Sequence, residues 1–349
     1  MNEEKLHELV GGLLQDLGGA FSIPLVQIGE RLGIYQSLNE NGPCTAEQLA
    51  EKTGLNQRYI QEWLCAQAAS KYISYDAETN SFSMTPEQAF VFADKDSPFY
   101  LAPAFTSASV FAENEPKVRE AFKTGQGVAW SEQSQCLSCA VAQFFRPGYQ
   151  NHLVQAWLPT LQGMAEKLDD GAMVADVGCG HGITTTLMAQ AFPKSKFVGL
   201  DFHEHSIDEA RKHAASHNLD NLSFQVSTAK DAPGKYDLVT IFDCLHDMGD
   251  PVGGMKHIKQ SINEGGACMI VEPMAGNSIA DNLNPVGRLY YNASTMVCIP
   301  TSLAQEQGAA LGAQAGEERL REVVVDGAGF SSFRKVTETP FNLVFEAIP

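Results

Sequence analysis

Apolar residues recur at helical intervals in the first third of the chain. Within 21–38 they fall three and four residues apart, which predicts one helix with a single apolar face. A capping box at Thr45 predicts a second helix that ends at Gly54, and a third helix is expected to start after Asn56. The stretch 72–85 then alternates in two short runs around a polar turn, as two paired strands do. Helices followed by a hairpin are typical of a winged helix.

From residue 151 to the end, short apolar runs alternate with helix-length segments. This alternation favours a mostly parallel sheet covered by helices on both faces. We expect a turn at Pro147-Gly148, then a helix at 151–168 and seven strands. The strands are expected at 173–177, 197–201, 223–226, 236–242 and 268–272, with a closing pair at 333–336 and 342–347. The predicted fold class is α/β: a Rossmann-like domain that follows a mainly helical winged-helix domain along the chain.

The length of 349 residues exceeds the usual size of one hydrophobic core, so more than one domain is expected. We place a winged-helix and dimerisation domain at 1–98, a helical linker and lid at 99–150, and the α/β domain at 151–349. Within the last, 277–316 is far longer than a connection needs and suits a cap over an apolar substrate pocket. Ordinary packing against the N-terminal half is the alternative for this insertion.

The charge balance argues against nucleic acid and anionic membranes as partners. The sequence has 24 Lys and Arg against 42 Asp and Glu, a net charge of −18, which repels phosphate groups. The last helix of the expected winged helix offers Arg58 against Glu62 and almost no other basic side chain. We therefore expect this domain to pair with a second copy or to cover a site, and a DNA-binding regulator is the alternative.

The sequence shows no sign of export or of a metal centre. The first residues are acidic rather than basic, and no run of ~18 apolar residues occurs, so neither a signal peptide nor a membrane span is expected. The eight cysteines lack the framework of a small secreted scaffold, which favours reduced thiols in the cytoplasm. His213 and His217 share a helix face without an evident third ligand, and Cys136 and Cys139 have no partner pair, so no metal site is predicted.

The strongest local signal is a glycine-rich turn after the first strand of the α/β domain. Asp176 lies in that strand, and Gly178, Gly180 and Gly182 follow before a helix starts. Glycines let the backbone approach a ligand closely, and a helix N-terminus presents free N–H groups. Ile183 stands where a dinucleotide fingerprint needs a small residue, and Asp176 would repel a pyrophosphate but not a ligand with an ammonium and a sulfonium. A dehydrogenase is therefore disfavoured, and a purely structural turn is the alternative.

Asp201 ends the second strand, about 20 residues after the glycine turn, the separation expected of an acid that binds ribose hydroxyls. The alternative is that Asp201 caps the next helix, but Ser206 and Glu209 have the form of a capping box for that helix. The polar stretch Ser227–Lys230 follows the third strand, where an adenine ring could be held.

The carboxyl end of the fourth strand carries Asp243, His246 and Asp247, at the edge where open α/β sheets bind ligands. A neutral imidazole can take the proton of a phenol or alcohol near pH 7, so His246 is the candidate general base. Glu272 ends the fifth strand and could hold the imidazole in its useful tautomer. The alternatives are that His246 only hydrogen-bonds the backbone or the ligand, and that Glu272 is solvated.

Several segments together carry a family resemblance. They read FRPGYQNHLVQAWLP, ADVGCGHG, FDCLHDMGDP, DNLNPVGRLYYNAS and EERLREVVVDGAGF. The sequence resembles class I S-adenosylmethionine-dependent methyltransferases with an N-terminal winged-helix domain, and in these segments it is similar to a bacterial group that includes mycobacterial members. The resemblance covers nearly the whole chain.

The resemblance implies a seven-stranded methyltransferase domain, its last strand antiparallel, that binds S-adenosylmethionine. The residues implied at the cofactor are Tyr149, Asp176, Gly178, Cys179 and Gly180 around the methionine part, Asp201 at the ribose, Phe202, Thr228, Ala229 and Lys230 at the adenine, and Asp243.

More distantly, plant and antibiotic-pathway O-methyltransferases carry a His-Asp-Trp stretch after the fourth strand, whose His is the base, and a Glu that ends the fifth. His246, Asp247 and Glu272 fall on those positions, and Met248 stands in place of the Trp. The predicted function is methyl transfer to a small-molecule acceptor, as O-methylation with His246 as base, in a cytoplasmic homodimer paired through the N-terminal domain. A regulator that senses the cofactor and an enzyme doing non-methylating natural-product chemistry are the alternatives.

Overall fold

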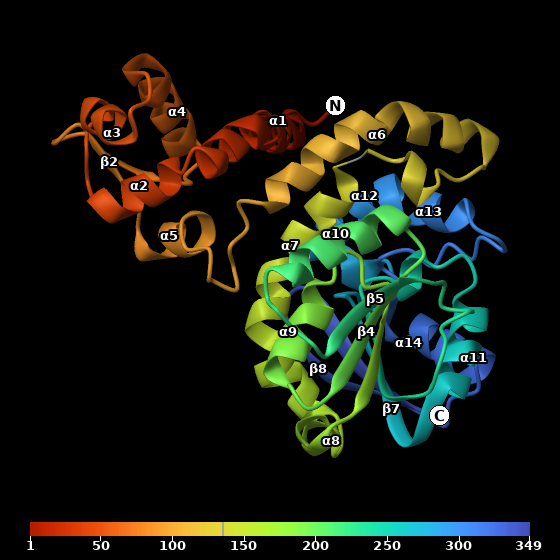
Figure 1. Cartoon of the computed structure of the whole chain (residues 1–349). Coiled ribbons are helices and arrows are strands. Elements are labelled where there is room, and N and C mark those ends of the chain that lie inside the picture. Colours follow the sequence, from red (N-terminus) through yellow and green to blue (C-terminus); the bar gives the residue numbers. More distant parts are fainter. Residues whose placement is uncertain (135) are drawn as a thin grey trace. The chain divides into compact units, whose positions relative to one another are not determined.

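The computed structural model describes residues 1–134 and 136–349 (Figure 1). The chain forms two compact units, each described by itself below. The first unit comprises Met1–Val110 with Gln143–Pro147, and the second comprises Phe111–Ala142 with Gly148–Pro349. The segment 99–150, expected as a linker and lid, is thus divided between the two units.

The first unit contains the predicted winged helix. Its elements are α1 (Glu3–Arg31), α2 (Ile34–Asn41), α3 (Ala46–Thr53), α4 (Gln57–Ala69), the antiparallel pair β1 (Ser74–Asp76) and β2 (Ser81–Ser83), and α5 (Pro86–Phe92). The capping box at Thr45 is formed, and Gly54 ends α3 in the left-handed region with φ 68°. The core gathers around Tyr35, whose hydroxyl donates a hydrogen bond to Gln67 (2.6 Å) and whose ring meets Trp63 edge-on.

The prediction of one helix over 21–38 is wrong. The chain breaks at Gly33, which has φ 67° and separates α1 from α2. This reversal lets apolar residues from both sides of the break enter one core, where Val26 and Leu38 are both fully buried. The regular apolar spacing continued across the break because both helices face that core.

Helix α1 has an exposed apolar side. By length and composition it is the one candidate membrane-spanning helix among the described residues, although only 11% of its most apolar window is buried. The sequence analysis predicts no membrane span, since no run of ~18 apolar residues occurs. One such helix near the N-terminus is weak evidence for a span, because signal sequences and core helices pass the same test. The exposed apolar side chains of α1 are Leu6, Leu9, Val10, Leu13, Leu14, Leu17, Phe21 and Ile28.

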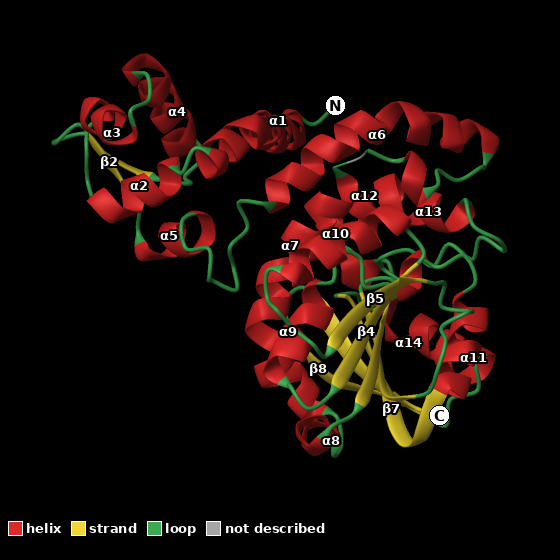
Figure 2. Cartoon of the chain, in the orientation of Figure 1, coloured by secondary structure: helices red, strands yellow, loops and turns green. Residues whose placement is uncertain are grey.

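The second unit is built on a seven-stranded sheet with helices on both faces (Figures 1 and 2), as predicted. In spatial order the strands are β5 (Leu222–Val226), β4 (Lys196–Asp201), β3 (Met173–Val177), β6 (Tyr236–Phe242), β7 (Ile262–Pro273), β9 (Asn342–Ile348) and β8 (Ser332–Glu338). The first five run parallel, while β9 pairs antiparallel with both of its neighbours. The central strands are buried on both faces, which explains their continuous apolar runs.

Helices α8 (Met164–Asp170), α9 (Ile183–Ala191) and α10 (Glu204–Ala215) cover one face of this sheet, and α11 (Pro251–Ser261) and α14 (Gly316–Arg321) cover the other (Figure 2). The remaining helices are α6 (Ala104–Thr124), α7 (Leu137–His152), α12 (Pro285–Ala293) and α13 (Ile299–Leu303).

Two local predictions ahead of the sheet are wrong. Pro147-Gly148 forms no turn and lies inside α7, where local sequence signals are overridden by the surrounding helix. The helix expected at 151–168 is interrupted: a π-turn at Leu153–Trp157 and a 3-10 turn at Leu158–Thr160 precede α8. Gly163 adopts φ 67° just before α8, so the chain changes direction there.

The sheet order places a ligand crevice by topology. Strand β3 pairs with β4 on one side and with β6 on the other, so the strand order reverses between β3 and β6. In open α/β sheets, ligands bind outside the carboxyl ends of the strands at such a point. The glycine turn follows β3 and the Asp243–Asp247 segment follows β6, so both lie at this edge.

Candidate active site

The glycine turn is held in a shape that other residues would strain. Gly178, Gly180 and Gly182 have φ of 74°, 52° and 69°. A side chain at Gly178 would collide with the Cys244 thiol, and one at Gly182 would meet the Phe224 ring at 2.5 Å, whereas nothing lies within 4 Å of the corresponding position at Gly180. The turn is therefore packed on two sides and open at Gly180.

Asp201 joins the end of β4 to this turn. Its Oδ2 accepts a hydrogen bond from the backbone N–H of Gly180 (2.9 Å), and its Oδ1 accepts one from the N–H of His203 (2.8 Å). Burial raises the pKa of the Asp201 carboxyl, and these two hydrogen bonds oppose that rise. The two features singled out in the sequence thus meet at one place, although the proposed capping box at Ser206 is wrong: Ser206 lies within α10, buried, and its hydroxyl bonds the His203 ring (2.9 Å).

Asp176 is fully buried between β3, β6 and α9. Its Oδ2 accepts hydrogen bonds from the hydroxyls of Thr184 (2.7 Å) and Thr185 (2.6 Å), and its Oδ1 accepts one from Thr240 (3.1 Å). Burial raises the pKa of this carboxyl, and the three hydroxyls oppose that rise. The carboxylate therefore anchors the start of α9 beneath the glycine turn.

The residues implied at the adenine lie beyond the ends of β4 and β5. Phe202 is 52% exposed, directly after Asp201. The Thr228 hydroxyl donates to Asp231 (2.7 Å), and Lys230 forms an ion pair with Asp250 (2.6 Å). Lys230 is thus held at the start of α11, while the Phe202 ring stays open to solvent.

Asp243 stands at the end of β6 in a strained conformation. Its backbone φ is 49°, in a region that residues other than glycine seldom adopt. Residues with such angles often lie at functional sites. Its carboxyl accepts hydrogen bonds from the Tyr149 hydroxyl (2.6 Å) and from the Asn342 amide (2.9 Å). Burial raises the pKa of Asp243 to about 8, because it outweighs the hydrogen bond from Tyr149.

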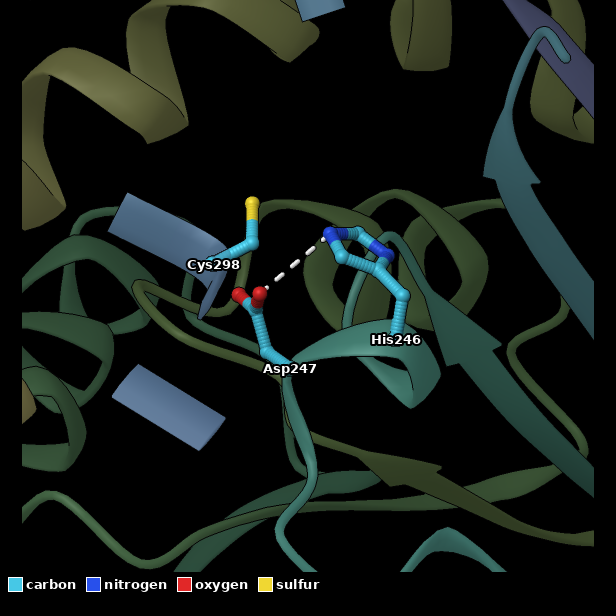
Figure 3. A group of neighbouring side chains, drawn as sticks. All are labelled: His246, Asp247 and Cys298. Atoms are coloured by element: carbon cyan, nitrogen blue, oxygen red, sulfur yellow. Dashed lines mark ion pairs between the residues drawn. The ribbon is translucent and has the colours of Figure 1, made fainter. Parts of the chain in front are cut away.

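His246 and Glu272 form a buried pair. Nδ1 of His246 lies 2.6 Å from Glu272 Oε2, and Glu272 Oε1 accepts the N–H of Leu245 (3.0 Å). On the other side, Nε2 of His246 lies 3.3 Å from Asp247 Oδ1 (Figure 3). Burial alone would lower the pKa of His246, but the two carboxylates outweigh it and raise the pKa well above its usual value.

The insertion 277–316 fixes the His246 loop. Gln305 accepts a hydrogen bond from the N–H of Gly249 (3.0 Å) and donates one to the carbonyl of Asp247 (2.8 Å), and the Ser302 hydroxyl donates to the carbonyl of Met248 (2.9 Å). In Figure 1, α12 and α13 lie over the edge of the sheet where the parallel strands end.

Sequence reasoning missed three residues at this edge: Asn342, Gln305 and Cys298. All three lie far along the chain from the residues they approach. None of them stands in a sequence motif that would mark it as part of a site, so only the folded structure reveals their position. The implied Cys179 is buried in the glycine turn, where burial raises its pKa well above the usual value.

Comparison with known families confirms the resemblance seen in the sequence. Residues 168–322 match the family described as a methyltransferase domain, and residues 20–93 match the Rv2258c-like winged HTH domain. Among curated proteins, the chain is similar to the ubiquinone biosynthesis O-methyltransferase of Leptothrix cholodnii, with 32% identity over 127 residues. That alignment covers 35% of this chain and 52% of the relative, so the chain spans about half the length of the curated relatives it matches.

Solved structures share the fold over nearly the whole chain. Human N-acetylserotonin methyltransferase in complex with SAM is 14% identical, with a TM-score of 0.71, and the match covers 97% of each chain. An O-methyltransferase family protein from Burkholderia thailandensis is 18% identical, with a TM-score of 0.67, over 100% of this chain and 98% of that protein.

Proposed function

This chain carries an N-terminal winged-helix domain followed by a methyltransferase domain, and from that premise we propose that it transfers the methyl group of S-adenosylmethionine to a small-molecule acceptor. The observation that carries the proposal is the hydrogen bond between Asp201 and the Gly180 backbone, since it joins the acid and the glycine turn in one crevice at the strand-order reversal. The curated relatives and the structural neighbours named above support the same chemistry.

The cofactor would lie across the ends of β3, β4 and β6. Gly178, Cys179 and Gly180 would approach its methionine part, with Tyr149 and Asp243 opposite, and Asp201 would bind the ribose hydroxyls. Phe202 has the exposure needed to stack on the adenine, next to Thr228, Ala229 and Lys230. Asp176, whose oxygens are already bonded, would act by holding the glycine turn rather than by contact.

We further propose O-methylation, with His246 as the base. When the acceptor hydroxyl attacks the methyl carbon, the carbon–sulfur bond breaks, the electron pair stays on sulfur, and the hydroxyl proton passes to the neutral imidazole. Because the pKa of His246 is raised well above its usual value, His246 must lose its proton before the transfer, so turnover should rise with pH. Glu272 and Asp247 flank His246 and would stabilise the imidazolium that forms. Holding the acceptor oxygen in line with the methyl group would provide most of the acceleration.

Replacement of His246 tests this role. His246→Ala should lower the turnover number by about 10²–10⁴-fold, the usual contribution of a general base, and leave the Kd for S-adenosylhomocysteine nearly unchanged. Turnover is measured against a panel of phenols and alcohols, and the Kd by calorimetry. A large loss of cofactor affinity would instead assign His246 to the cofactor, and tight cofactor binding with no methylated product from wild type would favour non-methylating chemistry.

We propose that the winged helix pairs two copies of the chain and does not read DNA. The outer side of α4 offers an ion pair between Arg58 and Glu62 and the exposed Tyr59 ring, with little positive charge to neutralise phosphates. Salt-dependent binding of a DNA fragment would support the regulator instead. A cytoplasmic location, with all eight cysteines free, is part of the same proposal.

A further inference from the structure

A buried chain of hydrogen bonds starts in the connection between α6 and α7, residues 125–134, and ends at the loop that carries His246. The connection lies against α13 of the insertion, within the second unit (Figure 1). Gln133 is only 5% exposed; it accepts a hydrogen bond from the Asn114 amide (3.0 Å) and donates one to the Thr301 hydroxyl (2.6 Å). Asn114 and Thr301 are buried as well. Gln133 therefore joins α6, the connection and α13 at one point that is shielded from solvent.

Two further contacts hold α13 from the same side. The N–H of Val128 donates a hydrogen bond to the carbonyl of Pro300 (2.9 Å). Gly127 lies so close to the end of α13 that a side chain there would collide with the backbone of Ala304. Helix α13 has only five residues, so its own hydrogen bonds stabilise it weakly. Its position therefore depends on the contacts that the connection makes with it.

The other side of α13 holds the loop that carries the proposed base. The amide of Gln305 donates hydrogen bonds to the carbonyl of Thr301 (3.1 Å) and to the carbonyl of Asp247 (2.8 Å). The hydroxyl of Ser302, the neighbour of Thr301, donates to the carbonyl of Met248 (2.9 Å). The path from the connection to the loop thus has two steps, first through Thr301 and then through Gln305.

We propose that Gln133 is a positioning residue, which acts through Thr301 and Gln305 to hold His246 in place. The kinetic consequence rests on the proposed function, because it takes His246 as the base. Removal of the Gln133 side chain leaves a buried hydroxyl on α13 and the buried Asn114 amide without their partner, which is costly, so α13 should shift or loosen. The sequence gave no sign of this link, since 168 residues separate Gln133 from Thr301.

The first test measures the loop itself, in the full-length protein without acceptor or cofactor. The backbone N–H groups of Asp247, Met248 and Gly249 are hydrogen-bonded, so their hydrogen exchange reports on the loop. By mass spectrometry, Gln133→Ala should exchange about tenfold faster in peptides that cover 245–250 and at the wild-type rate in β3 and β4. Unchanged exchange in the loop would overturn the proposal. Faster exchange throughout the second unit would show a general loss of stability and would also reject it.

Matched variants separate the hydrogen bond from packing. Thr301→Val has the shape of threonine without the hydroxyl and should loosen the loop as Gln133→Ala does, so it carries the test if Gln133→Ala does not fold. Thr301→Ser keeps the hydroxyl and should exchange like wild type. Gln67→Ala removes a buried amide of the first unit, which bonds Tyr35, and should leave the loop unchanged. Equal loosening in Thr301→Ser and Thr301→Val, or loosening in Gln67→Ala, would contradict the assignment.

The second test uses turnover with an acceptor that the wild-type protein methylates. Gln133→Ala should lower the turnover number about tenfold and keep the Kd for S-adenosylhomocysteine, because only the base is displaced. If Gln133 acts through Gln305, the double variant should be as slow as Gln305→Ala alone. Two losses that multiply in the double variant would refute the path. A wild-type protein that methylates no acceptor would count against the proposed function alone, and the exchange rates would still decide whether Gln133 positions the loop.

Discussion

The hydroxyl of Tyr149 donates a hydrogen bond of 2.6 Å to Asp243, and so joins α7 to the end of β6 across 94 residues of sequence. Burial raises the pKa of both groups, that of Tyr149 well above its usual value and that of Asp243 to about 8. Glu272 contributes to the second shift and His246 opposes it. The free protein therefore keeps a neutral carboxyl at a position where the proposed cofactor brings an ammonium group.

Cofactor affinity should rise with pH because of Asp243. Below pH 8 the carboxyl holds a proton that must leave before it can pair with the ammonium, so affinity changes by at most about tenfold per pH unit between pH 6 and 8 and levels off above. Asp243→Asn has no carboxyl proton to release, so this source of pH dependence is absent from the variant. The measurement is the Kd of S-adenosylhomocysteine in both proteins across this range, since the ligand's own titration is common to both. An identical pH dependence in the two proteins would rule out this role of Asp243.

The same shift makes the free protein less stable in alkali. Asp243 has its ordinary acidic pKa when the chain is unfolded and a pKa of about 8 when it is folded, so the folded state binds the extra proton in between. The stabilisation from this proton is complete at acidic pH and is lost as the pH rises through about 8. Urea unfolding of the free protein at several pH values should show this decline, and Asp243→Asn should make it shallower. A steeper decline in the variant would contradict the assignment.

The glycine turn offers a way to separate stability from binding. Gly178→Ala should lower the free energy of unfolding by several kcal/mol, because the new methyl group meets Cys244 and φ is positive. Gly180→Ala adds only the strain of a positive φ, about 1–2 kcal/mol, but its methyl group enters the open side of the turn. Urea unfolding and cofactor titration measure the two effects.

Gly54 is the matched control for Gly180. It also has a positive φ of 68°, and nothing lies within 4 Å of the position that a Cβ atom would take there, but it belongs to the first unit. Gly54→Ala should lose a similar amount of stability and keep cofactor affinity, whereas Gly180→Ala should lose at least tenfold in affinity. Equal affinities in the two variants would remove the cofactor from the glycine turn.

The sheet could be predicted from the sequence because its strands are buried on both faces. Strands β3 and β6 have the predicted bounds, since in each a continuous apolar run ends where glycine or polar residues begin. The glycine turn was visible for a similar reason: only glycine tolerates these backbone angles, so the sequence records the geometry.

The features that depend on tertiary contacts could not be predicted. The break at Gly33 leaves the apolar spacing intact, and Pro147 is accommodated within α7 although it has the form of a turn signal. Ser206 and Glu209 have a capping pattern, but α10 begins before them, with His203 as its N-cap residue. The backbone N–H of His203 donates a hydrogen bond to Asp201. Cys298 belongs to the site only because the insertion folds back on the end of β6.

The contact between the insertion and the His246 loop should affect turnover but not cofactor binding. Gln305→Ala removes the hydrogen bonds to Gly249 and to the carbonyl of Asp247, so His246 would lose its fixed position, and the turnover number should fall about 10-fold or more. Glu264→Ala, which changes an exposed side chain near the start of β7, is the control and should have wild-type kinetics. Steady-state assays and cofactor titration distinguish the effects. A fall in cofactor affinity without a fall in turnover would mean that the loop serves the cofactor.

The apolar side of α1 should be covered by a second copy of the chain. Leu6, Leu13 and Leu17 are separated by seven and four residues, about two turns and one turn of helix, and all three are exposed, so they share one side of the helix. An anionic membrane is a poor alternative cover, because Glu3, Glu4 and three further acidic side chains along the helix accompany only two basic ones.

Replacing both Leu13 and Leu17 by Asp should convert a dimer into a monomer, as measured by light scattering coupled to size-exclusion chromatography. Each apolar side chain fully buried by a partner contributes about 1.5–3 kcal/mol, so two charges in the contact should be sufficient to separate the copies. Gln15→Glu, on the opposite side of the same helix, adds a charge without touching the stripe and should remain dimeric. A wild-type monomer, or a protein that sediments with neutral lipid vesicles through α1, would reject the pairing.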